Sequence, residues 1–133
     1  MHRRGCFTGA LVVATFTLAT ACSSSSSSSS TAGGSSSSAP TDVSGESSTT
    51  MSAENFFFSP SDLSGTGGQK LTISLTNDGS VPHNLSITDQ NIDVTLDPGD
   101  SQDIKVTFPD SGSVQFFCSF HQTSGMVGTL QVA

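Results

Sequence analysis

The stretch Phe117-Cys118-Ser119-Phe120-His121-Gln122-Thr123-Ser124-Gly125-Met126 places a thiol, an imidazole and a thioether close together near the end of the chain. Cys118 and His121 have the spacing C-x2-H, and His121 and Met126 have the spacing H-x4-M. Thiolate, thioether and imidazole groups are ligands that transition metals accept. The stretch therefore predicts a metal site, and the segments around it must form the support that holds the site in shape.

A second imidazole lies upstream, at His83 in Val81-Pro82-His83-Asn84. Of the three cysteines, Cys6 falls in a predicted leader and Cys22 at its end, so Cys118 has no partner for a structural disulfide. A lone thiol in an exported protein requires another explanation, which metal ligation provides. Two imidazoles, one thiolate and a weak thioether form the ligand set of a blue-copper electron-transfer site.

Residues 1–21 are expected to be a secretory signal, because Arg3 and Arg4 precede an apolar stretch that is too short to span a bilayer. The segment ends in Leu18-Ala19-Thr20-Ala21-Cys22, which resembles a bacterial lipobox. Cys22 is then the mature N-terminus, carries lipid and anchors the protein to a membrane. The alternative is ordinary cleavage after Ala21, which releases a soluble protein. Either outcome places the protein outside the cytoplasm, in the periplasm or at the outer face of the cytoplasmic membrane.

Residues 22–50 are predicted to be a disordered tether, since runs of serine dominate this segment and leave little to bury. Residues 51–133 are predicted to form the single folded domain. The formal net charge of the chain is −7, and all 11 acidic residues follow Cys22, opposed there only by Lys70 and Lys105. This excess of negative charge excludes nucleic acid as a partner. It suits either solubility or an encounter with a basic protein.

The folded segment reads as a succession of short strands separated by turns. Apolar and polar residues alternate over 69–77, 83–87, 92–96 and 104–108, and turn signals rich in Gly, Pro, Asn and Asp lie between these runs. No long helical pattern is present. About seven to eight strands of this kind predict an all-β Greek-key sandwich or barrel.

Strand parity has a chemical consequence, because successive side chains of a strand point to opposite faces. His83 has the parity of Leu85 and Ile87, and Cys118 has the parity of Val114 and Phe116. Both ligands should therefore face the interior. If their strands are adjacent and antiparallel, the two side chains meet at one end of the core, where the following loop brings His121 and Met126.

Three other interpretations of these residues remain. Zinc accepts two histidines and a cysteine, although it gains little from a thioether. Cys118 and His121 could form a nucleophilic dyad, but that chemistry needs an open cleft, and the inward parity of Cys118 favours a protein that is not an enzyme. Met126 taken alone is typical of a core residue.

Residues 51–133 resemble the cupredoxins, and within them the plastocyanin type. The likeness rests on Phe117-Cys118-Ser119-x-His121-Gln122-x-x-Gly125-Met126-Val127-Gly128 and on Val81-Pro82-His83-Asn84. It implies one type 1 copper ion with His83, Cys118 and His121 as equatorial ligands and Met126 as the axial ligand.

The resemblance also implies roles around the ligands. The Asn84 backbone N–H would donate to the Cys118 sulfur, Asn84 and Ser119 would join the two ligand segments, and Pro82 matches the proline before the first histidine. Phe120 stands where plastocyanins have proline, so its backbone N–H is expected to give the sulfur a second hydrogen bond. Thr123 also departs from the family, and docking in the plastocyanin manner is therefore not expected to carry over.

These observations together predict a monomeric copper electron carrier that serves redox proteins such as a cytochrome or an oxidase. The alternative is a protein that delivers the copper ion itself. Supply proteins favour exposed, Met- or His-rich ligands, whereas after Cys22 this chain has only Met51 and Met126. A third interpretation, a metal-free sandwich that acts as a binding module, predicts that Cys118 has no influence on metal content.

Overall fold

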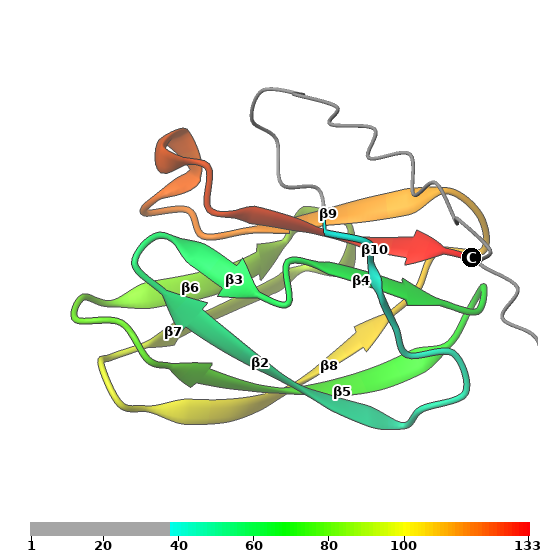
Figure 1. The fold of residues 1–133 in the computed structure, drawn as a ribbon, viewed down its shortest axis with the longest axis horizontal. Coiled ribbons are helices and arrows are strands. Elements are labelled where there is room, and N and C mark those ends of the chain that lie inside the picture. Colours follow the sequence, from blue (N-terminus) through cyan, green and yellow to red (C-terminus); the bar gives the residue numbers. More distant parts are fainter. Residues whose placement is uncertain (1–37) are drawn as a thin grey trace, which may run out of the picture. The chain divides into compact units, whose positions relative to one another are not determined.

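The computed structural model describes residues 38–133, which form two β-sheets packed face to face (Figure 1). One sheet has six strands in the order β1-β4-β10-β9-β6-β7, and the other has four in the order β3-β2-β5-β8. The ten strands are β1 (Thr41–Asp42), β2 (Ser48–Glu54), β3 (Phe57–Ser59), β4 (Asp62–Gly65), β5 (Lys70–Asn77), β6 (His83–Ile87), β7 (Ile92–Leu96), β8 (Ser101–Thr107), β9 (Ser113–Phe117) and β10 (Val127–Val132).

The predicted all-β sandwich is confirmed. Two short 3-10 turns, η1 (Thr88–Gln90) and η2 (Gln122–Ser124), are the only helical elements among residues 38–133. In the same part of the chain, no helix has the length and apolar character needed to cross a membrane. The strand count exceeds the prediction partly because β1 and β3, with two and three residues, are too short to show an alternating pattern.

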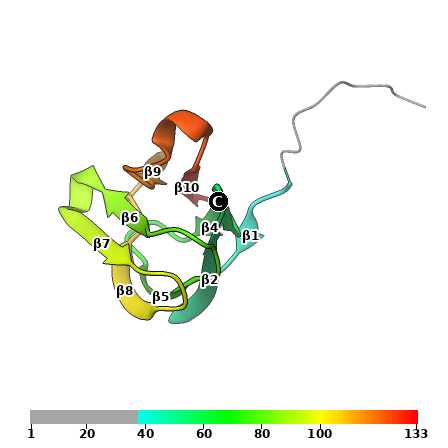
Figure 2. The ribbon, with the colours of Figure 1, turned by 90° about the vertical axis from the view of Figure 1, so that its left-hand side faces the viewer.

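The core forms between the sheets from the alternating apolar residues of the strands. In β5, Leu71, Ile73 and Leu75 are buried while the residues between them are not, as the sequence pattern predicts. Two of the residues that pair with them in the neighbouring strand β8, Ile104 and Val106, are buried in the same way. Figure 2 shows the two sheets from the end. The buried apolar residues of both sheets form one core cluster.

An aromatic contact joins the two sheets near the end of β9. Phe58 in β3 and Phe116 in β9 are buried, and their rings meet edge to face with centroids 5.2 Å apart. Such pairs stabilise a fold beyond the burial of their area. The end of β9, from which Cys118 follows, is therefore held against the opposite sheet.

The folded part begins earlier than residue 51, where the sequence analysis placed it. β1 lies inside the predicted tether and pairs in parallel with β4, and β2 begins at Ser48 in parallel register with Thr72 of β5. Val43 between them is buried. The residues of 41–50 are mostly polar, so that pairing with strands distant in sequence, and not a local pattern, orders them. The predicted signal, Cys22 and the serine-rich stretch up to residue 37 lie outside the described residues.

Candidate metal centre

The three side chains singled out by the sequence come together at the end of the sandwich where β6 begins and β9 ends. That end of the two strands is at the left in Figure 1. His83 is the first residue of β6, Cys118 directly follows β9, and His121 immediately precedes η2. β6 and β9 are adjacent and antiparallel, with Ser86 opposite Phe117. The pairing of these two strands, which the sequence left open, is therefore present, and it places His83 beside Cys118.

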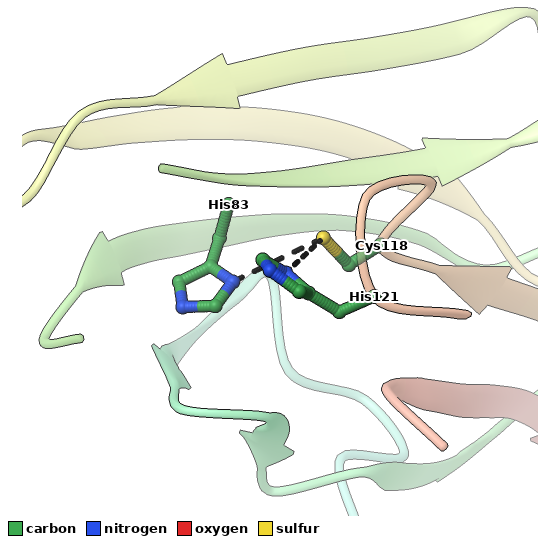
Figure 3. A group of neighbouring side chains, drawn as sticks. All are labelled: His83, Cys118 and His121. Atoms are coloured by element: carbon green, nitrogen blue, oxygen red, sulfur yellow. Dashed lines mark hydrogen bonds between the residues drawn. The ribbon is translucent and has the colours of Figure 1, made fainter. Parts of the chain in front are cut away.

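The donor atoms lie at separations that a single metal ion requires. Cys118 Sγ is 3.5 Å from His121 Nδ1 and 3.9 Å from His83 Nδ1 (Figure 3). One ligand atom from each of the three residues can be chosen so that all lie within 4.8 Å of one another. An ion about 2.0 Å from nitrogen and about 2.3 Å from sulfur, with about 110–120° between the bonds, separates the sulfur from each nitrogen by about 3.5–3.7 Å. The residues present thus fit a small transition-metal ion.

Burial distinguishes the histidines. His83 is 1% exposed and Cys118 is fully buried, whereas His121 is only partly buried. Burial, and secondarily the neighbouring His121, lowers the pKa of His83. Both effects favour the neutral imidazole, which is the form that offers a lone pair to a metal.

Backbone hydrogen bonds hold the loop between β9 and β10 in a closed form. The Cys118 N–H donates to the Met126 carbonyl at 3.0 Å, and the Met126 N–H donates to the His121 carbonyl at 3.2 Å. Gly125 before Met126 has φ of +88°, a conformation that glycine adopts without a steric penalty. Met126 is fully buried, so the structure places its side chain in the interior at the same end of the sandwich.

Asn84 links the two segments that carry the ligands. Its backbone N–H donates to Cys118 Sγ at 3.4 Å, its side-chain amide donates to Ser119 Oγ at 2.8 Å, and its side-chain oxygen accepts from the Ser119 N–H at 2.7 Å. The amide also donates to Asp93 at 2.7 Å and lies 3.0 Å from Ser86 Oγ, which itself donates to Asp93 at 3.2 Å. Sequence reasoning missed these last two residues, although Ser86 shares the parity of Asn84 and pairs with Asp93 across β6 and β7.

The predicted hydrogen bond from Phe120 to the sulfur is absent from the described part of the chain. The donor that the structure shows for Cys118 Sγ is the backbone N–H of Asn84. Phe120 lies inside a turn that the His121 N–H closes onto the Cys118 carbonyl at 3.1 Å. The Cys118 carbonyl oxygen thus accepts the hydrogen bond that closes this turn. Residue types alone do not determine the direction of the Phe120 N–H inside the turn.

An apolar surface surrounds the exposed side of His121. Val81, Pro82, Phe120 and His121 line a shallow hollow of about 290 Å³. The Phe120 side chain is 55% exposed. Phe56, which sequence reasoning did not single out, covers His121 from the β2–β3 turn, with ring centroids 4.6 Å apart. The three consecutive phenylalanines 56–58 were a signal for it, since a single strand cannot bury all of them.

The donor set itself favours copper over zinc. A nitrogen, nitrogen and thiolate set on a rigid β-scaffold suits both oxidation states of copper, and a buried methionine belongs to the same loop. Zinc sites more often use four strong donors.

Comparisons with known proteins show which family the chain resembles. A family model described as a cupredoxin-like domain matches residues 10–132. Plastocyanin from Cucurbita pepo is 32% identical over 87 residues, which cover 56% of this chain and 86% of that protein. Plastocyanin from Sambucus nigra is 32% identical over 89 residues, with the same shares covered. In fold, a dithionite-reduced auracyanin from the photosynthetic bacterium Roseiflexus castenholzii superimposes with a TM-score of 0.55 at 20% identity, covering 65% of this chain and 97% of that one.

Proposed function

Because the chain belongs to the cupredoxin-like family, we propose that it is a mononuclear type 1 copper protein that carries single electrons between redox proteins outside the cytoplasm. One observation carries the proposal: a buried thiol and two imidazole nitrogens converge at distances that a single ion can bridge. Copper, when bound, supplies one-electron redox chemistry. The remaining steps belong to the protein.

In this proposal His83, Cys118 and His121 would hold the copper ion, and the buried Met126 of the same loop would be the fourth ligand. The sandwich fixes these side chains before any ion arrives, since β6, β9 and the closed loop are held by their own hydrogen bonds. A site that is already shaped rearranges little when the charge of the ion changes. The Asn84 N–H donates to the Cys118 sulfur and so helps to hold that side chain in place.

His121 is the proposed point of electron exchange, because it alone among the three clustered donors reaches the surface. The apolar hollow around it suits brief contact with a partner protein. The burial of Cys118 and Met126 supports electron transfer over delivery of the ion, which requires ligands that a receiving protein can reach. The same burial speaks against Cys118 as a nucleophile that attacks a substrate.

We further propose that residues 1–21 direct export, that lipid attached to Cys22 anchors the chain and that the serine-rich tether lets the folded part move beside the membrane. The excess of acidic residues after Cys22 favours basic partners of the cytochrome or oxidase kind. Mass spectrometry of the exported protein tests the anchor: the expected N-terminal peptide begins at an acylated Cys22, and an unmodified N-terminus would contradict it.

Titration of the full chain with one equivalent of Cu(II), followed by optical and paramagnetic-resonance spectra, tests the electron-carrier function. The expected result is an intense blue colour from the copper–thiolate bond and reversible one-electron reduction. Cys118→Ser is the matched control and should lose the colour while retaining the fold. A wild-type protein that stays colourless with bound copper, or that binds zinc and no copper, would refute the proposal.

A further inference from the structure

The turn between β2 and β3 contacts the proposed ligands, although it belongs to neither of the segments that carry them. Asn55 and Phe56 form the two-residue connection between Glu54 and Phe57, which pair across the hairpin. Phe56 lies against His121, and its ring also meets the edge of His83 with centroids 6.2 Å apart. Asn55, the other residue of this turn, contacts the same histidine, with its side-chain oxygen 3.2 Å from His83 Nε2.

The hydrogen-bond partners of Asn55 determine which of its side-chain atoms faces the histidine. The Ser80 backbone N–H, which can only donate, points at Asn55 Oδ1 from 3.2 Å. Asn55 Nδ2 donates to Ser80 Oγ at 2.8 Å. The oxygen must therefore occupy the position that it has here, and a flipped amide would set two donors against each other.

An amide oxygen can only accept a hydrogen bond, so His83 Nε2 must carry the ring proton. In a neutral imidazole the other nitrogen is then unprotonated. That nitrogen is Nδ1, which points at Cys118 Sγ from 3.9 Å. The tautomer that Asn55 selects is thus the one whose lone pair faces the cluster.

The contact between Asn55 and His83 depends on the absence of a side chain at Gly79. A Cβ atom at position 79 would lie 2.5 Å from Asn55 Oδ1 and 2.7 Å from His83 Nε2. The hairpin is held in place independently, because the Asp78 N–H donates to the Ala53 carbonyl at 2.9 Å. The sequence thus leaves space for Asn55 and His83 to meet and fixes the backbone on both sides of their contact.

We propose that Asn55 is a positioning residue that locks His83 in the Nε2-protonated tautomer and so prepares Nδ1 for the metal. The inference rests on the proposed function for its consequence, copper binding, but not for the tautomer itself. Groups that orient a ligating histidine through its second nitrogen typically change metal affinity about 10- to 100-fold. Since the Asn55 residue is exposed to water, which can replace part of its role, a loss near tenfold is expected.

The test uses the full chain without metal and reads the His83 tautomer by long-range proton–nitrogen correlation NMR, at a pH above the ordinary range of histidine. In the wild-type protein His83 should carry its proton on Nε2. Asn55→Ala should populate both tautomers and bind copper about tenfold more weakly. Asn55→Asp keeps an acceptor oxygen, so His83 should remain protonated on Nε2 in this variant. Ser80→Ala, which removes only the bond at the other end of the amide, should leave the tautomer unchanged.

Asn55→Leu, of similar size but without an acceptor, serves if Asn55→Ala does not fold. A folded Asn55→Ala or Asn55→Leu protein with the wild-type tautomer and wild-type affinity would overturn the positioning role. Failure of the proposed function looks different: the wild-type protein would bind no copper, while the NMR comparison of tautomers would still decide the role of Asn55.

Discussion

The link between Asn84 and Ser119 can be tested without metal by a double-mutant cycle. Asn84→Ala removes the acceptor of the Ser119 N–H, the donor to Ser119 Oγ and the donor to the Asp93 carboxylate. Neutral hydrogen bonds contribute about 1 kcal/mol each and charged ones about 1.5–3 kcal/mol, so the gross loss is about 3.5–5 kcal/mol. Asp93 and Ser119 are exposed and water will replace part of this, so a net loss near 3 kcal/mol is expected.

Ser119→Ala removes one of the same bonds and should cost about 1 kcal/mol. The double variant should then be less destabilised than the sum of the single ones, with a coupling of about 1 kcal/mol. Urea unfolding followed by far-UV circular dichroism is the suitable assay, because the chain contains no Trp or Tyr for fluorescence. Thr95→Ala, opposite Asn84 in β7 and facing solvent, is the control and should change stability by less than about 0.5 kcal/mol. Additivity of Asn84→Ala and Ser119→Ala within about 0.3 kcal/mol would show that the two ligand segments are not joined in this way.

Three further outcomes follow from packing and from the site. Gly128→Ala should destabilise the fold by about 3 kcal/mol, because the added Cβ would lie 2.1 Å from the Ser61 carbonyl oxygen and 2.3 Å from the Phe116 ring; urea unfolding with an unchanged midpoint would contradict this. Phe116→Ala should cost about 3–5 kcal/mol since the side chain is fully buried, whereas Phe57→Ala, 48% exposed, is its matched control and should cost far less in the same assay. Copper at about 1,000 times its Kd should stabilise the protein by about 4 kcal/mol, and a chelator should reverse the rise in thermal midpoint; equal midpoints with and without copper would speak against a site formed in the folded state.

The parts of the fold that could be predicted are those whose signal is local. Leu71, Ile73 and Leu75 alternate with polar residues, so β5 and its buried face are readable from the sequence. Strand parity likewise turned His83 and Cys118 inward, and the short spacing between Cys118 and His121 left little freedom for the second imidazole.

The parts that escaped prediction depend on contacts distant in sequence or on the orientation of single peptides. β1 is made of Thr41 and Asp42, which carry no strand signal and are ordered by pairing with β4. Asn55 is 28 residues from His83, and no local sequence pattern indicates that the β2–β3 turn lies against this histidine. The missing Phe120 hydrogen bond has the same origin, since residue identity does not say where an N–H points within a turn.

The outermost strands of the two sheets have a consequence for behaviour at high concentration. β1 and β3 end their sheets with two and three residues, so they offer few free backbone groups to another molecule. The other borders, β7 and β8, carry ionic side chains at Asp93, Asp103 and Lys105. Short or charged borders discourage the addition of a foreign strand. Copies crowded together should therefore resist aggregation and fibril growth.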